Sequence, residues 1–454
     1  MDNYKQSAQA AEGALASDTL AAKKVFERHY SQKIGVLAGY LPKESKYVAS
    51  WLSGIVKEAL AAREGKSAED LQPAVLAMAE LLEHHNELRD LVRLMIAEGQ
   101  DVHRQYEPDT TYTVNSIETM LYAMNHIIMR APPFTPDVPH SAFPMSGLFV
   151  YMMWTRGGEH VFKDDKFNAK LADILDAWCT YLDSPTSLNV ITTGAEGWLN
   201  TKSYTDNDLD QFVSKQQQRD DPVHWGYTSF NDFFHRQIIA NTRPIDGAGN
   251  PAVVTSANDG TVYRIAREVK RTDSFDCKSQ NYSLENMLDG RHVDRFVGGD
   301  VVQSFLSGNN YHRWWAPISG TIIEKRVVPG FMFSELYGEG FDDSAGTQSQ
   351  GYEANVNTRG LVFIESDDPS IGMVCVMPIG ITEISSVDIQ VEVGDKVKKG
   401  QELGWFSYGG SSMCLIFQSG AIKQFTIVNP EPDSDSDNGP FIRVGGQIAI
   451  THTR

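Results

Sequence analysis

The chain has few cysteines and few basic residues for its length. Its four cysteines in 454 residues form no CxxC pair and stand mostly among apolar neighbours: Cys179, Cys277, Cys375 and Cys414. They indicate buried free thiols and fit a reducing cytoplasm. The 40 lysines and arginines face 59 acidic residues, which gives a net charge of −19. Such a charge repels nucleic acid and anionic lipid headgroups, whereas a small amine-bearing or zwitterionic substrate is compatible with it.

Long hydrophobic runs are also lacking. The longest apolar stretch, residues 143–154, contains a proline, a serine and a glycine. It is far shorter than the roughly 20 residues that a membrane-spanning helix needs. The first 20 residues are polar and rich in alanine, without the pattern of a signal peptide. We therefore expect a cytoplasmic protein without a transmembrane helix or stable membrane insertion.

The length and the 41% hydrophobic content predict two domains, and the first is helical. Apolar residues recur with helical spacing between residues 19 and 182, notably at 48–60 and over one segment at 74–96. Asn115 or Ser116 is positioned to cap a helix that runs to Met129, and a further helix is expected at 166–182. No convergent acid–base set stands in this half, which favours a helical cap or a dimerisation surface that would make a homo-oligomer.

The second half is predicted to be rich in strands. A polar stretch at 184–221 precedes an aromatic amphipathic helix at 227–236 and a proline-marked strand at 242–246. Short alternating strands follow, for example at 253–255, 261–263, 320–323 and 387–393. The last of these resembles the strands of lipoyl and biotinyl carrier domains, without their modified lysine. We predict an α+β protein with a helical domain at 1–225 and a β-rich domain with barrel-sandwich-like strands at 226–454.

Two glycines and two serines, at 409–412, join the apolar runs 405–408 and 413–417. Glycine lacks a Cβ, so a strained turn there is able to expose the Gly410 carbonyl to the Ser411 hydroxyl. That geometry suits an N→O acyl shift, followed by β-elimination to dehydroalanine and hydrolysis to a pyruvoyl group. Taken alone, the tetrapeptide is more often an ordinary turn.

A serine hydroxyl needs a base before it attacks a carbonyl. His312 stands in an aromatic segment, residues 311–317, and Asp259 stands at a strand–turn boundary in residues 256–262. Each residue alone is more often structural, but together with Ser411 they form a carboxylate, an imidazole and a hydroxyl in chain order. We interpret them as a candidate catalytic set.

These motifs, with the Phe-Phe-x-Arg helix at 233–236, resemble the phosphatidylserine decarboxylase family from about residue 230 to the end. The resemblance implies self-cleavage between Gly410 and Ser411, a covalent pyruvoyl cofactor derived from Ser411, and two associated β and α chains. It also implies that Asp259 and His312 act with Ser411, and that a Schiff base with the substrate amine serves decarboxylation. Family members commonly have a second histidine where this chain has Trp315. We place Trp315 in the pocket, with Tyr311 and Ser412 beside it.

The helical half carries a narrower likeness. Residues 150–156, 197–200 and 381–385 resemble the fungal tryptophan decarboxylase branch, which implies a free, aromatic amino acid as substrate. The alternatives are a phosphatidylserine decarboxylase that makes phosphatidylethanolamine, and a non-processing, carrier-like binding protein.

We expect no metal site in the chain. His84 and His85 are adjacent in a helical pattern and would point about 100° apart. The acidic run at 433–439 lacks the glutamate that closes a calcium-binding EF-hand loop, which favours a solvated loop.

Overall fold

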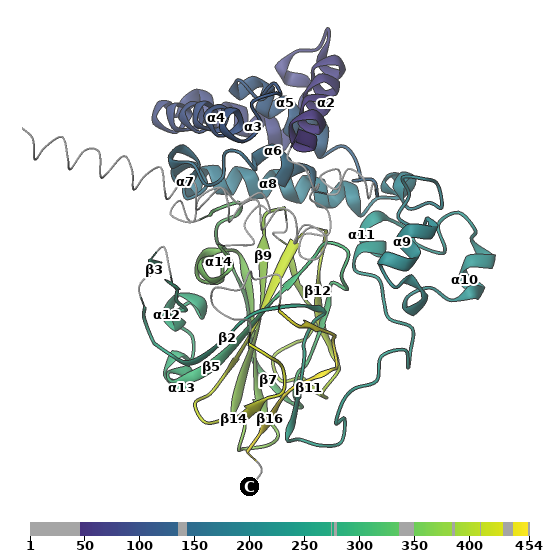
Figure 1. Cartoon of the computed structure of the whole chain (residues 1–454), viewed down its shortest axis with the longest axis vertical. Coiled ribbons are helices and arrows are strands. Elements are labelled where there is room, and N and C mark those ends of the chain that lie inside the picture. Colours follow the sequence, from purple (N-terminus) through teal and green to yellow (C-terminus); the bar gives the residue numbers. More distant parts are fainter. Residues whose placement is uncertain are drawn as a thin grey trace, which may run out of the picture.

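The computed structural model describes residues 46–134, 143–273, 275–276, 279–335, 349–383, 386–408, 410–429 and 439–452. A layer of helices from the first half covers one end of a β-rich second half (Figure 1). This arrangement confirms the α+β class. The expected helical pattern at 19–45, Cys277 and most of the acidic run at 433–439 lie outside the described residues.

The described part of the helical half runs from residue 46 to the first residues of the β-rich half. Its helices are α2 (Lys46–Arg63), α3 (Pro73–His84), α4 (Asn86–Tyr106), α5 (Ile117–Ile127), α6 (Pro144–Phe149), α7 (Arg156–Val161), α8 (Asp165–Leu182), α9 (Thr201–Asp206), α10 (Lys215–Asp220) and α11 (Phe230–Phe234). Ser116 caps α5 through a reciprocal capping box with Thr119, and Asp164 caps α8 by accepting from two backbone N–H groups. The expected helices near 116–129 and 166–182 are therefore confirmed.

Two details of the helical pattern were wrong. The segment at 74–96 is two helices, because His85 adopts an extended conformation (φ −115°, ψ 90°) that ends α3 and precedes α4. In α2, Leu52 and Val56 are buried as expected, but Leu60 is 45% exposed. The buried stripe of α2 is thus narrower than its apolar sequence suggests.

The β-rich half is built on an antiparallel eight-stranded sheet of order β11-β7-β8-β9-β13-β5-β2-β15. Its strands are β2 (Gly260–Val269), β5 (Gly299–Leu306), β7 (Gly320–Val328), β8 (Arg359–Ser366), β9 (Met373–Ile381), β11 (Lys396–Val397), β13 (Gly410–Phe417) and β15 (Phe441–Ile442). Two three-stranded sheets contain β1 (Val253–Thr255), β16 (Gln447–Thr451) and β14 (Ile422–Phe425), and β10 (Val387–Ile389), β12 (Glu402–Phe406) and β6 (Arg313–Trp315). A short pair, β3 (Phe275–Asp276) and β4 (Ser279–Gln280), completes the described strands.

The structure corrects three strand predictions. The proline-marked segment 242–246 is not a strand, and the strand expected at 387–393 ends at Ile389. Gly410, Ser411 and Ser412 lie within β13 rather than in a turn. Moreover, β12 and β13 do not form a hairpin, because they belong to different sheets. The strands expected at 253–255, 261–263 and 320–323 are confirmed as parts of β1, β2 and β7.

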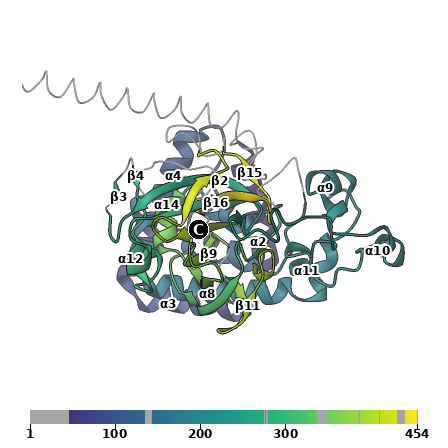
Figure 2. The ribbon, with the colours of Figure 1, turned by 90° about the horizontal axis from the view of Figure 1, so that it is seen from below.

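Strand β13 is buried on both faces, and its side chains alternate between two hydrophobic clusters. Met413, Leu415 and Phe417 belong to a cluster that also includes Trp178 of α8 and Phe234 of α11. Cys414 and Ile416 belong to a second cluster, which includes residues of the short helices α12 (Leu284–Met287), α13 (Val293–Phe296) and α14 (Gln350–Val356). Figure 2 shows the strands from below, with helices behind them. The first cluster joins the helical layer to the end of the sheet where β13 begins.

Free thiols were expected, and Cys375 and Cys414 are free and buried while Cys179 is free and half-buried. None of the described helices has a run long and apolar enough to cross a bilayer.

Candidate active site

Three strand ends bring the predicted site segments to one end of the large sheet. Thr261 of β2 pairs with Phe305 of β5, and Leu306 of β5 pairs with Ser411 of β13. Neighbouring strands lie about 4.8 Å apart, so the residues around these pairs share one edge of the sheet. Asp259 lies just before β2, and the segment after β5 leads to His312. The register therefore gathers the three motifs that are separate in sequence.

Ser411 has a buried hydroxyl without a partner. Its side chain is 0% exposed, and its Oγ has no hydrogen-bond partner among the described residues. The neighbouring Ser412 differs, because its Oγ accepts from Gln303 Nε2 at 2.9 Å and donates toward the Ser304 carbonyl oxygen at 3.1 Å. An unpaired buried hydroxyl is costly for stability. The distinction singles out Ser411 as the hydroxyl that is available for chemistry.

His312 presents a basic nitrogen in the same region. Its ring is fully buried and stacks on Phe234, with centroids 4.0 Å apart and an interplanar angle of 25°. Nε2 lies 3.2 Å from the carbonyl oxygen of Ser307, the residue after β5. A carbonyl oxygen only accepts, so Nε2 carries the proton and Nδ1 has the free lone pair. Nδ1 has no hydrogen-bond partner among the described residues.

The charge state of His312 also suits a base. Burial lowers the pKa of the imidazole well below its ordinary value of 6.5, and the neighbouring Arg236 and His235 lower that pKa further. Both causes disfavour the protonated ring. His312 is therefore neutral at physiological pH, with its basic atom unoccupied.

Asp259 is held by a different partner from the one expected. Its Oδ1 accepts from Arg243 Nη1 at 2.5 Å and from the Val444 backbone N–H at 2.8 Å. Among the described residues, no hydrogen bond joins Asp259 to His312, or His312 to Ser411. The geometry thus brings the segments together without assembling a hydrogen-bonded triad, and the predicted roles of the three residues stay predictions. The proline-marked segment carried no signal that Arg243 would pair with Asp259.

Tyr311 and Trp315, which were predicted to line the pocket, lie near the ion pair between Arg243 and Asp259. Trp315 is half-buried and its Nε1 donates to the Tyr311 hydroxyl at 3.2 Å. The Arg243 guanidinium carbon lies 5.5 Å from the centre of the Tyr311 ring. Trp315 is therefore linked through Tyr311 to the Arg243–Asp259 ion pair.

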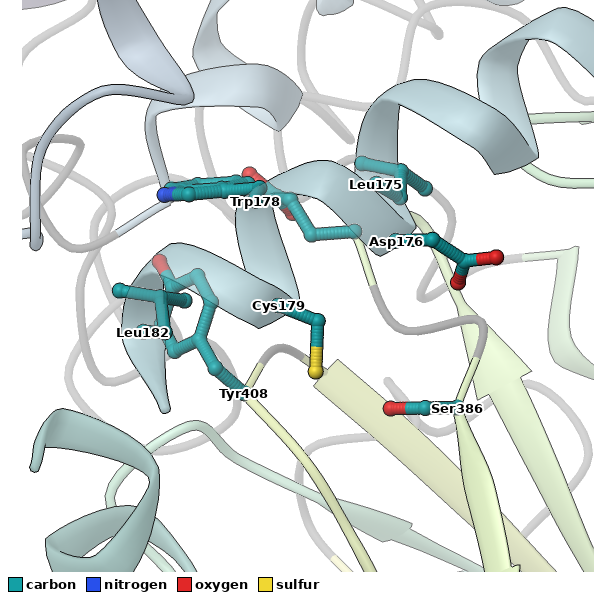
Figure 3. A pocket seen from close by; sticks show the side chains of 8 residues that line it. Leu175, Asp176, Trp178, Cys179, Leu182, Ser386 and Tyr408 are labelled. Carbon is teal, nitrogen blue, oxygen red and sulfur yellow. The ribbon is translucent and has the colours of Figure 1, made fainter. Parts of the chain in front are cut away.

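A small pocket lies beside the site, between α8 and the strand ends. Figure 3 shows Cys179 of α8 projecting toward Ser386, with Tyr408 below the helix. Asp176 and Glu383 also line this pocket. Burial raises the pKa of both carboxyl groups, and Asp173 adds to the effect at Asp176. The helix expected at 166–182 was not expected to line a pocket, so the contribution of α8 to this region was missed.

The chemistry of the site fits a group made from the chain itself. Among the described residues, no three or more His, Cys, Asp or Glu side chains are grouped to hold a metal ion. An unpartnered, buried serine that directly follows a glycine fits the source of a pyruvoyl group. His312 Nδ1 fits the accompanying base.

Comparison with known proteins identifies the family. A family model described as phosphatidylserine decarboxylase matches residues 230–448, and a second model of the same description matches residues 72–207. The decarboxylase iboD of Amanita muscaria (strain Koide BX008) is 35% identical over 331 residues, which cover 68% of this chain and 91% of that protein. The chain belongs to the phosphatidylserine decarboxylase family.

Other relatives fall into two groups by name. The L-tryptophan decarboxylase of Psilocybe cubensis is 29% identical, over 72% of this chain and 76% of its own length. The phosphatidylserine decarboxylase proenzyme 2 of Oryza sativa subsp. japonica is 29% identical, over 45% of this chain and 31% of its own. The family member described here is accordingly a decarboxylase, a carboxy-lyase.

Proposed function

We propose that the chain is a precursor that cleaves itself between Gly410 and Ser411 and then decarboxylates a free, aromatic amino acid. The observation that carries the proposal is a pair of buried atoms without partners, Ser411 Oγ and His312 Nδ1. One is a nucleophile that needs to lose a proton, and the other is a neutral base. Both lie at the end of the sheet where β5 ends and β13 begins.

Self-cleavage would begin at the Ser411 hydroxyl and end with a pyruvoyl group at the new N-terminus. Ser411 Oγ attacks the Gly410 carbonyl carbon while His312 Nδ1 takes the hydroxyl proton. The Gly410–Ser411 C–N bond breaks, the Ser411 nitrogen takes a proton, and an ester remains. Loss of the Ser411 α-proton and cleavage of the Cβ–O bond release the Gly410 carboxylate and leave dehydroalanine. Addition of water and loss of ammonia then leave the pyruvoyl group at the new N-terminus.

Decarboxylation would use the same residues around that group. A pyruvoyl carbonyl, joined to the substrate amine, supplies the electron sink that loss of carbon dioxide requires. His312 Nδ1, after taking a proton, is placed to deliver it to the substrate α-carbon. The buried surroundings, which include Phe234 and Tyr408, exclude water from this step.

A free amino acid fits the charges better than phosphatidylserine does. Asp176 and Glu383 line the pocket beside the site, and none of the described residues that line it is a lysine or an arginine. A phosphodiester headgroup is best bound by such cations. The net charge of −19 further opposes docking at an anionic membrane. Of two relatives that the chain resembles over most of its length, one is named L-tryptophan decarboxylase and the other is named decarboxylase iboD.

Two measurements test the proposal. Intact mass spectrometry should find a chain of residues 1–410 and a short chain of 44 residues (454 less 410) that begins with the group derived from Ser411. Ser411→Ala should leave one full-length chain, whereas Ser412→Ala should retain some cleavage. Carbon dioxide release should be measured with a panel of free amino acids and with phosphatidylserine in detergent micelles. A full-length chain after prolonged incubation contradicts self-cleavage, and turnover of the phospholipid alone contradicts the substrate.

A further inference from the structure

The helical half reaches the cleavage site at two places. Gly410, at the start of β13, pairs with Ile381 at the end of β9. Glu383 lies two residues after Ile381, and Tyr408 lies two residues before Gly410. Both residues contact the helical half of the chain. The segment after β9 and the segment before β13 are therefore both attached to it, next to the pair Ile381–Gly410.

The first attachment is a buried carboxylate. Glu383 is 4% exposed, and its Oε1 accepts from the backbone N–H of Ser146 at 2.7 Å. Its Oε2 accepts from the Ser146 hydroxyl at 2.5 Å and from Thr382 Oγ1 at 3.0 Å. Ser146 belongs to α6 and lies 237 residues away in sequence. Two of these three hydrogen bonds come from Ser146, so this contact fixes the end of β9 to the helical layer.

Thr382 shows that the end of β9 is under strain. Its φ is +52°, a left-handed conformation that a β-branched residue rarely adopts. Such strain persists only where the surrounding structure holds it, and it gathers at functional sites. The Thr382 hydroxyl donates to Glu383 Oε2, and Glu383 in turn accepts from Ser146. The hydrogen bonds of Glu383 therefore hold the strained Thr382 in place, next to Ile381, which pairs with Gly410.

The second attachment is aromatic. The Tyr408 ring packs edge-on against Trp178 of α8, with centroids 5.2 Å apart, and lies parallel to Phe143 at 6.2 Å. It also packs against Phe234 at 5.3 Å, and Phe234 in turn stacks on His312. Figure 3 shows Tyr408 beneath α8. One chain of ring contacts thus links α8 to Tyr408, in the segment before Gly410, and to the proposed base.

We propose that the helical half is a working part of the self-cleavage apparatus: Glu383, held by Ser146, and Tyr408, held by Trp178, position the Gly410–Ser411 peptide bond for attack. The inference rests on the proposed function and deepens it. Glu383 and Tyr408 are positioning residues, because they act through the backbone on either side of the bond. A misplacement of about 1 Å is enough to slow a positioned reaction about 100-fold.

A graded set of variants tests the positioning role. Glu383→Ala removes all three hydrogen bonds, and we expect self-cleavage to slow at least about tenfold. Glu383→Gln keeps a planar side chain with an acceptor, and the Ser146 hydroxyl is able to reverse its role, so most of the rate should return. Ser146→Ala, which keeps the backbone N–H, should fall between them. The matched control is Glu365→Ala, which removes a half-exposed carboxylate from its ion pair with Arg295. Glu365 lies on β8 and pairs with Met373 at the start of β9, at the opposite end of that strand from Glu383.

Hydrogen exchange provides a readout that needs no cleavage. In the Ser411→Ala background, Glu383→Ala should speed exchange of the amides at 380–383 and 410–412, while Glu383→Gln and Glu365→Ala should not. If the parental chain never cleaves itself but Glu383→Ala still speeds this exchange, the proposed function is refuted and the attachment of β9 to the helical half stands. Unchanged exchange, or equal cleavage rates for Glu383→Ala and the parent, would overturn the positioning role. Equal losses of rate in the Ala and Gln variants would overturn it as well.

Discussion

The pH dependence of self-cleavage tests the role of His312 as base. Burial, with Arg236 and His235 nearby, holds the pKa of its imidazole well below the ordinary 6.5. At pH 5.5, a histidine of ordinary pKa would be only about 9% neutral, because the pH lies one unit below that value. His312 should remain neutral there, since its basic form is lost only as the pH falls through the lowered pKa. We expect the cleavage rate constant to change less than about twofold between pH 7.5 and 5.5, against about tenfold for an ordinary histidine.

The assay follows newly made precursor after transfer to buffers across this range. Cell-free synthesis in the cold supplies the precursor, and a denaturing gel gives the cleaved fraction against time. The Ser411→Ala chain serves as the folding control, because its near-ultraviolet circular dichroism reports tertiary structure at each pH. His312→Gln should lower the rate at every pH. A tenfold fall centred on pH 6.5, in a chain that stays folded, would refute the reasoning.

Three further predictions concern particular contacts. Arg243→Met should lower the free energy of unfolding by about 3–5 kcal/mol in urea titrations, because Asp259 would be left buried and unpaired. Arg295→Met, which breaks a half-exposed pair, should cost less than about 1 kcal/mol, and similar losses in the two variants would contradict the assignment. Trp315→His should self-cleave within about threefold of the parental rate on gels if His312 is the base, and a tenfold gain would instead favour a base at that position. Ser116→Ala should cost about 1 kcal/mol in the same titrations because α5 loses its cap, and no loss would contradict the capping box.

Local sequence signals predicted local structure well. A cap at Asn115 or Ser116 was expected because the residue types that accept from helix N–H groups are few, and the structure has the cap at Ser116. The break at His85 was not predictable in the same way, because apolar residues with helical spacing stand on both sides of it. Leu60 was assigned to the buried stripe on spacing alone. Its exposure depends on which helices pack against α2, and spacing does not contain that information.

Long-range contacts were beyond the sequence pattern. The order of Asp259, His312 and Ser411 suggested a hydrogen-bonded set, but the partner of Asp259 is Arg243. The contact between Glu383 and Ser146 joins residues 237 positions apart, and the likeness of segment 381–385 to the tryptophan decarboxylase branch gave no sign that Ser146 would be its partner. Strand order explains both outcomes. The order of the strands determines which strand ends lie next to one another. The glycine–serine segment gave no indication that β13 would pair with β5 and β9 rather than with β12.

The position of β13 also determines what cleavage does to the fold. Strand β13 lies between β5 and β9, and its residues from Ser411 to Phe417 pair with both neighbours. Its five side chains at 413–417 are at most 3% exposed. At about 1.5–3 kcal/mol for each large apolar side chain, burial of Met413, Leu415, Ile416 and Phe417 contributes roughly 6–12 kcal/mol toward holding the strand in place. We therefore expect the two cleaved chains to stay associated until a denaturant separates them. A break before Ser411 leaves the pairing of residues 412–417 with β5 and β9 in place, so the new N-terminus stays at the end of the sheet where β5 leads to the His312 segment.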